Sequence, residues 1–250
     1  MQIQVLSDIH LEMNPCDIPV VGDIIVLAGD IHAGTAGIAW AKQQFVGRHI
    51  VYTAGNHEFY GHVFPDLLID LRAAAAGSNV AFLENDLFIK DGVRFLGATL
   101  WTDFTLNGYA SQEISMATAK HGINDFRGRI KKSTGELLRP NNVAETYRQS
   151  LAWLKEKLAE KHEGPTVVVT HHAPCVMSSH PWVRCDTLSP AFVSNLENLI
   201  LDFQPQVWVS GHTHYCSNYH IGATRMISNQ RGYSDQDDTG GFKPGLVVEV

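Results

Sequence analysis

Short apolar runs alternate with segments of helical character in the first third of the chain. The runs at residues 3–6, 24–28 and 50–52 are almost entirely apolar, which is typical of strands that are buried on both faces. Residues 37–45, between two of these runs, and residues 63–76, after the last, have the spacing or composition of helices. This alternation predicts parallel strands that are joined by helical crossovers.

Antiparallel hairpins are predicted in the central and C-terminal parts of the chain. The first centres on Asp91-Gly92, a dipeptide that strongly favours a tight hairpin turn. The second centres on Gly222, which lies between two short apolar runs. Because both parallel and antiparallel neighbours are expected, the sheets are predicted to be mixed.

The remaining pattern completes the prediction of the fold. Further strands are predicted at residues 87–90, 93–98, 166–170, 206–210, 219–221, 224–227 and 246–250, and further helices at residues 143–161 and 190–201. We therefore predict an α/β (α+β) fold, a four-layer α-β-β-α sandwich of two mixed β-sheets flanked by helices. We expect a single domain over residues 1–250, with a variable, flap-like segment at about residues 101–140, where the spacing is irregular.

Five of the apolar runs are followed directly by a short polar cluster. The clusters are Asp8-Ile9-His10, Gly29-Asp30, Gly55-Asn56-His57-Glu58, His171-His172 and Gly211-His212-Thr213-His214. In open α/β sheets the active site lies at the carboxyl ends of the strands, so these side chains are expected to converge. Carboxylate, imidazole and carboxamide ligands suit Mn, Fe, Zn or Ni. The clusters therefore predict metal ions at this edge of the sheets.

The residue types also suit a pair of metal ions. A hydrolytic two-metal centre holds its ions roughly 3.5–4 Å apart, which requires a shared carboxylate. Asp30 is the candidate, because Gly29 allows the backbone to turn sharply before it. Asn56 would supply a neutral oxygen and limit the negative charge at the site. Alternate residues such as Asp8 and His10 can point to the same side of an extended turn.

The order of the clusters resembles that of the calcineurin-like metallophosphoesterases. The family pattern is DxH, GD, GNH followed by an acidic residue, a later His and GHxH, and every element occurs here between Asp8 and His214. The resemblance implies one metal held by Asp8, His10, Asp30 and His214, and a second held by Asp30, Asn56, His171 and His212. It also implies that His57 stabilises the phosphate and protonates the leaving group.

The resemblance implies a metal-dependent phosphoesterase, a hydrolase that uses two divalent or trivalent metal ions. We expect a small phosphodiester as substrate, attack by a metal-bridging hydroxide, and His57 as general acid. The alternatives are a phosphomonoesterase, including protein and nucleotide phosphatases, and less favourably a nuclease. A different class is a non-catalytic interaction module with a degraded site, but no cluster is degraded here.

Three residues within the clusters have more than one interpretation. His171 and His172 are adjacent, and only one should bind metal. The family usually uses the first of such a pair, which leaves His172 behind the ligands or facing the substrate. Glu58 could orient His57, or it could be a surface or helix-start carboxylate.

Other candidates for substrate contact lie outside the clusters. Residues 120–139 contain six positive and two negative side chains within an acidic protein. This segment is either a solvated loop or a mobile flap that brings Arg127 or Arg129 to an anionic substrate, since Arg binds phosphate in bidentate fashion. His180 lies in the loop after the strand that precedes His171 and is a candidate for the rim of the site.

Composition narrows the possible partners. Hydrophobic residues make up 44% of the 250 residues and charged residues 18%, an ordinary balance for a folded protein. The formal net charge of −7 argues against a nucleic-acid-coating protein, which would need a basic face. No apolar stretch approaches the ~20 residues that span a bilayer, and no secretory signal is visible. We expect a cytoplasmic protein that acts on a small phosphate ester.

Overall fold

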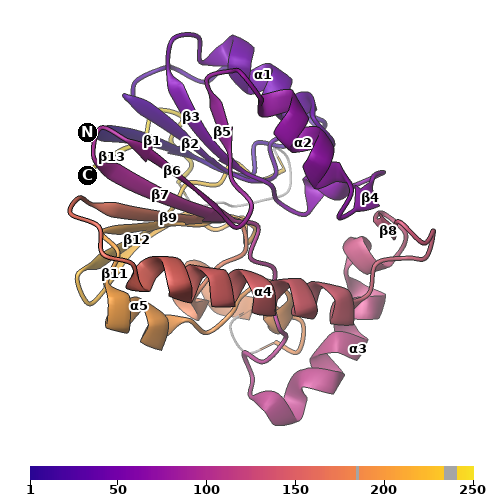
Figure 1. Ribbon diagram of the computed structural model, residues 1–250. Helices are drawn as coiled ribbons and strands as arrows, with labels where there is room; N and C mark the ends of the chain where they lie inside the picture. Colours follow the sequence, from indigo (N-terminus) through magenta and orange to yellow (C-terminus); the bar gives the residue numbers. More distant parts are fainter. Residues whose placement is uncertain (184–185, 234–240) are drawn as a thin grey trace.

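Two β-sheets face each other across the middle of the molecule, and helices cover their outer faces (Figure 1). The computed structural model describes residues 1–183, 186–233 and 241–250. The layers are helix, sheet, sheet and helix, so the predicted four-layer sandwich is confirmed. The two termini lie side by side, and the Met1 ammonium group donates a hydrogen bond to the Val250 carbonyl at 2.8 Å.

The first sheet is mixed and has five strands. They are β1 (Gln2–Leu6), β2 (Ile24–Ala28), β3 (His49–Thr53), β5 (Val80–Phe82) and β13 (Val247–Glu249). Their order in space is β13-β1-β2-β3-β5, with β13 antiparallel to β1 and the other pairs parallel. The sequence predicted every strand except β5, because a strand of three residues is too short to show a period.

The second sheet is also mixed and has six strands. They are β6 (Asp86–Lys90), β7 (Val93–Ala98), β9 (Thr166–Thr170), β10 (Val207–Val209), β11 (Ser217–Ile221) and β12 (Thr224–Ser228). Their order is β11-β12-β10-β9-β7-β6, with parallel pairs in the centre and an antiparallel strand on each edge. The two edge strands belong to the hairpins predicted at Asp91-Gly92 and Gly222, which are confirmed.

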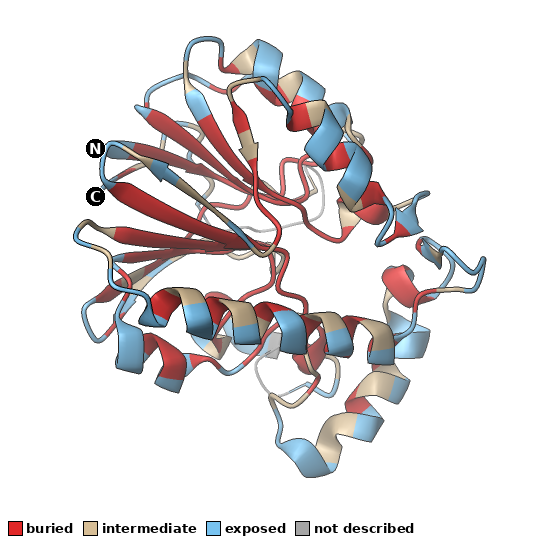
Figure 2. Ribbon diagram, viewed as in Figure 1, coloured by how far each residue is buried: buried red, intermediate tan, exposed pale blue. Residues whose placement is uncertain are grey.

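Four of the five helices described cover the sheets. The helices are α1 (Ala36–Gln44), α2 (Leu67–Ala75), α3 (Gln112–Gly122), α4 (Pro140–Ala159) and α5 (Glu197–Phe203). Helices α1 and α2 cover the first sheet, whereas α4 and α5 cover the second (Figure 1). Their buried residues face the sheets and their exposed residues face outward (Figure 2). Within the described part of the chain, no helix is both long and apolar enough to cross a membrane.

Alternate residues of the central strands face opposite layers of the core. In β1, Ile3 and Val5 belong to the core between the two sheets, whereas Leu6 belongs to the core beneath the helices. In β10, Trp208 faces the helices while its two valine neighbours face the other sheet. Because both faces are apolar, these strands appear in the sequence as continuous hydrophobic runs. The sheet pair is thus a packed base from which the loops at the strand ends project.

The helix expected from residue 63 begins instead at Leu67. Phe64 precedes Pro65, and a residue before proline is disfavoured in the helical conformation. Val63–Phe64 therefore form the short strand β4, which pairs with β8 (Lys131–Lys132). This pairing ties the segment at residues 101–140, expected to be irregular, to the first half of the chain.

The helix expected at residues 190–201 is also shorter than predicted. Ser189–Ala191 form a 3-10 turn, and α5 begins only after it. Val193, between the two, pairs with Ala173 in an isolated parallel bridge, and the Ser194 amide donates to the Ala173 carbonyl at 2.9 Å. These bonds hold the segment extended, because the same backbone groups cannot also form a helical ladder.

Gly97 in β7 provides a test of the packing between elements. A Cβ at this position would lie 2.4 Å from the Cβ of Leu83 and 2.9 Å from the Cγ2 of Thr53. We expect Gly97→Ala to lower the free energy of unfolding by about 1–3 kcal/mol through overpacking. Gly245→Ala is the matched control, since the nearest described atoms would lie 3.7 Å from its Cβ. Urea denaturation of both variants measures the effect, and equal midpoints would contradict it.

Candidate active site

The predicted metal ligands converge at one edge of the sheet pair. Asp8 and His10 follow β1, Asp30 follows β2, Asn56 follows β3, His171 follows β9, and His212 and His214 follow β10. An isolated parallel bridge between Ser7 and Gln230 joins the end of β1 to the end of β12. The parallel strands of both sheets therefore end at the same place, and their loops form one site.

The first cluster contains Asp8, His10, His214 and one oxygen of Asp30. The Nε2 atom of His10 lies 3.1 Å from Nε2 of His214 and 3.8 Å from Oδ2 of Asp30. Nε2 of His214 in turn lies 3.5 Å from Oδ1 of Asp8. The other ring nitrogen of His10, Nδ1, donates to the carboxylate of Glu12 at 3.1 Å. Nε2 of a neutral His10 ring therefore carries a lone pair, as metal binding requires.

The second cluster contains Asn56, His171, His212 and the other oxygen of Asp30. The Nε2 atom of His171 lies 3.0 Å from Oδ1 of Asn56 and 3.2 Å from Nδ1 of His212. It also lies 3.4 Å from Oδ1 of Asp30. Nδ1 of His171 donates to the Ala28 carbonyl at 2.9 Å, which leaves Nε2 as the atom that faces the cluster.

The atoms of the second cluster fit a cation. Around Nε2 of His171, the oxygens of Asn56 and Asp30 can only accept, so these atoms repel one another unless a proton or metal ion lies among them. Burial lowers the pKa of His171, but the carboxylate of Asp30 outweighs it and raises that pKa to about 10. Without metal, Nε2 of His171 therefore carries a proton. A metal ion bound among these atoms would displace that proton.

Asp30 connects the two clusters. Its side chain is 2% exposed, with Oδ1 facing His171 and Oδ2 facing His10. Burial raises the pKa of Asp30, but the surrounding imidazoles lower it more strongly, well below its usual range. The carboxylate is thus ionised and offers one oxygen to each cluster, which is the arrangement that a bridging ligand needs.

Most of the predicted ligands have a left-handed backbone conformation. The φ angles are 52° at Asp8, 49° at His10, 54° at Asp30, 71° at His212 and 48° at His214. Residues other than glycine rarely adopt these angles, and each such residue costs about 1–3 kcal/mol. The conformation ends the strand abruptly and turns the side chain into the site. The packing of the residues before and after each ligand must therefore impose the left-handed conformation.

Two of the motif glycines are required by close approach of the ligands. A Cβ at Gly55 would lie 2.1 Å from Oδ1 of Asp30 and 2.7 Å from Cε1 of His171. A Cβ at Gly211 would lie 2.6 Å from Oδ2 of Asp8. Any side chain at these positions would displace a ligand, so glycine before Asn56 and before His212 follows from the geometry of the site.

Glu58 does not orient His57 and does not lie at the surface; it holds the ligand-bearing turns together. It is 0% exposed. Its Oε2 accepts hydrogen bonds from the amides of Asp30 at 2.9 Å and Gly55 at 2.7 Å. Its Oε1 accepts from the Ile31 amide at 2.9 Å and the Tyr52 hydroxyl at 2.7 Å. Only its position in a 3-10 turn, His57–Phe59, agrees with the helix-start interpretation.

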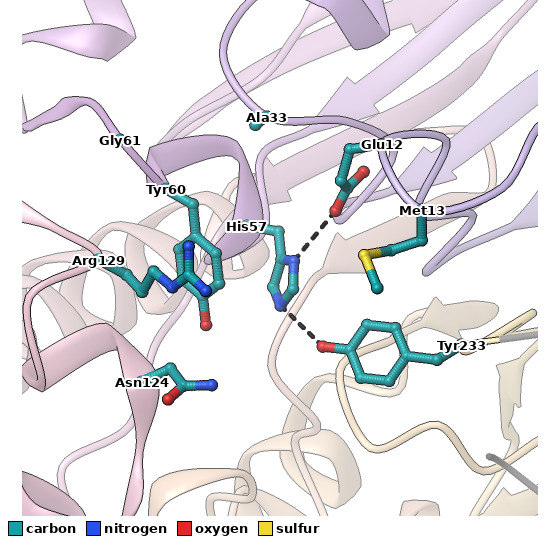
Figure 3. Close-up of a pocket in the computed structure, with 9 residues that line it drawn as sticks. All are labelled: Glu12, Met13, Ala33, His57, Tyr60, Gly61, Asn124, Arg129 and Tyr233. Carbon is teal, nitrogen blue, oxygen red and sulfur yellow. Dashed lines mark hydrogen bonds and ion pairs between the residues drawn. The ribbon is translucent and has the colours of Figure 1, made fainter. Parts of the chain in front are cut away.

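The carboxylate beside His57 belongs to Glu12. Its Oε1 lies 3.1 Å from Nδ1 of His57, while the hydroxyl of Tyr233 lies 2.9 Å from Nε2 (Figure 3). Tyr60 stacks on the imidazole with ring centroids 4.1 Å apart. Burial lowers the pKa of His57, but the carboxylates of Asp30 and Glu12 raise it to about 9. His57 in this structure is therefore an imidazolium at neutral pH and can donate a proton.

Asp125 links the segment at residues 101–140 to the site. Its Oδ1 accepts a hydrogen bond from Nδ2 of Asn56 at 3.0 Å and another from the Tyr60 hydroxyl at 2.7 Å. The first bond fixes the carboxamide so that its oxygen faces His171. The segment predicted to be flap-like is thus joined to the site by a buried carboxylate.

Two cavities meet at His57. The larger, about 500 Å³, is lined among others by Glu12, Met13, His57, Tyr60, Arg129 and Tyr233 (Figure 3). The second, about 380 Å³, contains the metal side and is lined among others by Asp30, Asn56, His57, Tyr60, His212, His214 and Tyr233. The His57 ring belongs to both linings, so it lies on the boundary between the metal ligands and the larger cavity.

The structure separates Arg129 from the other candidates for substrate contact. The Arg129 guanidinium lies 5.9 Å from the centre of the Tyr60 ring in the lining of the larger cavity. Arg127 is exposed and lines neither of the two cavities. His180 also lies outside both linings, where it stacks on Trp182 and packs against Tyr215.

His172 lies behind the ligands and does not face the substrate side. Its ring is 1% exposed and packs between His212, with centroids 4.1 Å apart, and Trp101, at 5.0 Å. Burial lowers the pKa of His172, and the neighbouring His171 lowers it further, so the ring is neutral. Of the two interpretations made from the sequence, the structure favours the one in which His172 supports the ligands.

Four residues of the site were not identified from the sequence: Glu12, Tyr60, Asp125 and Tyr233. Glu12 had a signal, because it continues the alternation of Asp8 and His10 by one more step. Tyr233 follows the end of β12 by five residues, but no polar cluster marks this strand end. Asp125 and Tyr60 have no local signal, since their roles arise only from packing.

The mixed sheets and the two ligand clusters at their shared edge are the features of a metal-dependent hydrolase of phosphoric esters. The chain belongs to the calcineurin-like phosphoesterase family, whose model matches residues 1–216. A relative in Acanthamoeba polyphaga mimivirus, Uncharacterized protein L509, is 27% identical over 218 residues, covering 80% of this chain and 73% of the viral protein.

Solved structures share the fold. Phosphopantetheinyl hydrolase (PptH) from Mycobacterium tuberculosis superposes with a TM-score of 0.69 at 17% identity, covering 93% of this chain and 89% of that one. A putative 5'-nucleotidase from Staphylococcus aureus gives a TM-score of 0.51 at 15% identity, covering 92% of this chain and 49% of the nucleotidase. At these identities the likeness supports the fold alone.

Glu58 provides a test of how the ligand turns are held. In Glu58→Gln an amide group replaces one acceptor and faces backbone donors, so we expect the free energy of unfolding to fall by about 3 kcal/mol. Metal content should fall with it, because Asp30 and Asn56 lie on the two turns that Glu58 joins. Tyr52→Phe removes one donor only and should cost about 1 kcal/mol with metal retained. Thermal unfolding and elemental analysis measure both effects; an undisturbed Glu58→Gln protein would contradict this role.

Proposed function

We propose that the protein hydrolyses a small phosphodiester at a two-metal centre, with His57 as general acid. The observation that carries the proposal is the position of His57 between the ligand clusters and the larger cavity. Its Nε2 lies 4.0 Å from Oδ2 of Asp30 on the metal side, and the same ring lines the larger cavity. An ester oxygen that leaves phosphorus toward this cavity would pass within reach of Nε2.

The two clusters divide the proposed ligands between two ions. One ion would be held by Asp8, His10, Asp30 and His214, and the other by Asp30, Asn56, His171 and His212. When bound, the ions supply the charge that ionises a water molecule near neutral pH and neutralises the phosphate oxygens. Nitrogen and oxygen ligands of these types suit Mn, Fe, Zn or Ni. The two oxygens of Asp30, each facing its own cluster, support a shared ligand.

The chain's own residues would complete the reaction. The His57 imidazolium donates its Nε2 proton to the departing oxygen, which matters most for a poor, alkoxide-like leaving group. Stacking on Tyr60 holds the plane of the ring, with centroids 4.1 Å apart. The phenol oxygen of Tyr233 lies 2.9 Å from Nε2, so an oxygen atom fits at the position that a leaving group must reach.

A third cavity supports a diester rather than a monoester. It measures about 240 Å³ and shares Leu188, Phe192 and Thr213 with the lining of the metal-side cavity. A phosphodiester has a substituent on each side of phosphorus. The larger cavity would hold the leaving group and this smaller, more apolar cavity the retained substituent. A phosphomonoester would leave one of the two unfilled.

Metal reconstitution followed by a panel of phosphate esters tests the proposed function. We expect about two metal ions per chain, loss of activity after chelation, and recovery when Mn is added. Bis-p-nitrophenyl phosphate should be hydrolysed faster than p-nitrophenyl phosphate. The reverse preference would favour a phosphomonoesterase, including a nucleotide or protein phosphatase with the same centre. A metal-loaded protein that is inactive on the whole panel would instead indicate a non-catalytic interaction module.

Arg129 and Arg127 form a matched pair for testing substrate contact. Both are exposed arginines of one loop, but only Arg129 lines the larger cavity. For diesters whose leaving group carries a carboxylate, we expect Arg129→Met to raise KM about 2–5-fold, because an exposed ion pair contributes at most about 1 kcal/mol. Arg127→Met should leave KM unchanged, as should either variant with bis-p-nitrophenyl phosphate. If the two substitutions raised KM equally, the positive charge of the loop as a whole, and not a contact of Arg129, would be responsible.

A further inference from the structure

We infer that Glu12 is a positioning residue, which sets the orientation of His57 and His10 together through a single carboxylate oxygen. The inference rests on the proposed role of His57 and adds a residue that the ligand motifs do not include. Glu12 is not one of the proposed metal ligands, and although it lines the larger cavity, it would act through the two imidazoles.

One atom of Glu12 makes both contacts. Oε1 lies 3.1 Å from Nδ1 of His10 and 3.1 Å from Nδ1 of His57. A carboxylate can only accept hydrogen bonds, so both Nδ1 atoms must carry the proton. In both rings Nε2 then faces Asp30, at 3.8 Å from His10 and 4.0 Å from His57. A single acceptor thus fixes which nitrogen of each ring faces the reaction.

The other neighbours of His57 cannot do this. Tyr60 stacks on the face of the ring and fixes its plane, but a stacking contact does not distinguish the two nitrogens. Tyr233 lies at Nε2 on the opposite edge of the ring from Glu12 (Figure 3). A phenol hydroxyl can either donate or accept, so it adapts to either protonation state. Among the neighbours of His57 in the described part of the chain, only the carboxylate of Glu12 requires a proton on Nδ1.

Within the described part of the chain, the side-chain hydrogen bonds of Glu12 all go to the two histidines. Its second oxygen, Oε2, is buried and has no hydrogen-bond partner within the described part of the chain. Its backbone is fixed as well, because the Leu11 and Met13 amides on either side donate to carbonyls at 3.0 Å and 2.9 Å.

The shared oxygen joins a metal ligand to the proton donor. His10 belongs to the first cluster, and its ring centroid lies 4.5 Å from that of His57. If either ring turned, Oε1 would lose one of its two donors, and the carboxylate, whose Oε2 already has no partner within the described part of the chain, would be left less satisfied. The proton donor is therefore held at a constant distance from the metal side of the site.

A double-mutant cycle tests the inference. Glu12→Gln keeps the size of the side chain and removes the charge, and we expect it to lower kcat about 10–100-fold for diesters with aliphatic leaving groups. For p-nitrophenyl diesters, which need no protonation, the loss should be a few-fold at most. In a His57→Gln background the same substitution should cause a much smaller loss, the part that acts through His10, and metal content should stay at the wild-type level. Glu145→Gln on the exposed face of α4 is the control.

Other outcomes overturn the inference. An undiminished loss in the His57→Gln background, or a fall in metal content that matches the loss of activity, would show that Glu12 acts through His10 alone. Equal losses for good and poor leaving groups would show a general structural role. Unchanged activity would show that the contact has no effect.

A measurement independent of turnover separates this inference from the proposed function. Nitrogen-15 NMR of the Zn-loaded protein reports which ring nitrogen of His57 is protonated, with the signal assigned by its loss in His57→Gln. We expect a protonated Nδ1 in the wild type and a changed Nδ1 signal in Glu12→Gln. An identical spectrum would overturn the role of Glu12 even if the protein hydrolysed no ester in the panel. Inactivity with the expected spectrum would instead count against the proposed function.

Discussion

The buried carboxylate of Asp30 is the group on which the site depends. Asp30 lies at the end of β2. Its Oδ2 faces His10, which follows β1 of the first sheet, and its Oδ1 faces His171 at the end of β9 of the second sheet. A buried carboxylate is stable only when cations or donors surround it. Imidazoles from both sheets provide this surrounding, and the His57 amide donates to Oδ1 at 2.8 Å. The contact between the sheets at this edge is therefore partly electrostatic.

A second carboxylate, Glu58, keeps the first in place without touching it. It accepts the amides of Asp30 and Ile31 on one turn and of Gly55 on the other. Two acidic side chains are thus buried near each other, each satisfied by its own donors, and burial together with Asp30 raises the pKa of Glu58. Several left-handed ligand residues add strain of about 1–3 kcal/mol each. The apolar core between the sheets offsets these costs, and the result is a set of side chains that need little reorganisation before the reaction.

The sequence predicted what depends on local patterns. Buried strands appear as apolar runs, and the polar residues at their ends appear in sequence beside them, so the side chains that converge in the two clusters could be named before the structure was known. Glu58 was misinterpreted because it follows the same strand as Asn56, yet its side chain turns inward to collect backbone amides from a different strand end. Asp125 could not be found, because its partner Asn56 is distant in sequence. Such contacts depend on how the layers pack, and this packing cannot be predicted from a local sequence pattern.

The contact between Asp125 and Asn56 has a consequence for specificity. Asp125 belongs to the segment at residues 101–140, which also carries Arg129 into the lining of the larger cavity. The same carboxylate fixes the carboxamide of Asn56 and the hydroxyl of Tyr60, which stacks on His57. A change in this segment that reshapes the cavity would therefore also shift the carboxamide of Asn56 and the ring of His57. The shape of the larger cavity and the geometry of the second cluster are joined through Asp125, so this segment cannot vary freely even though the family motifs lie outside it.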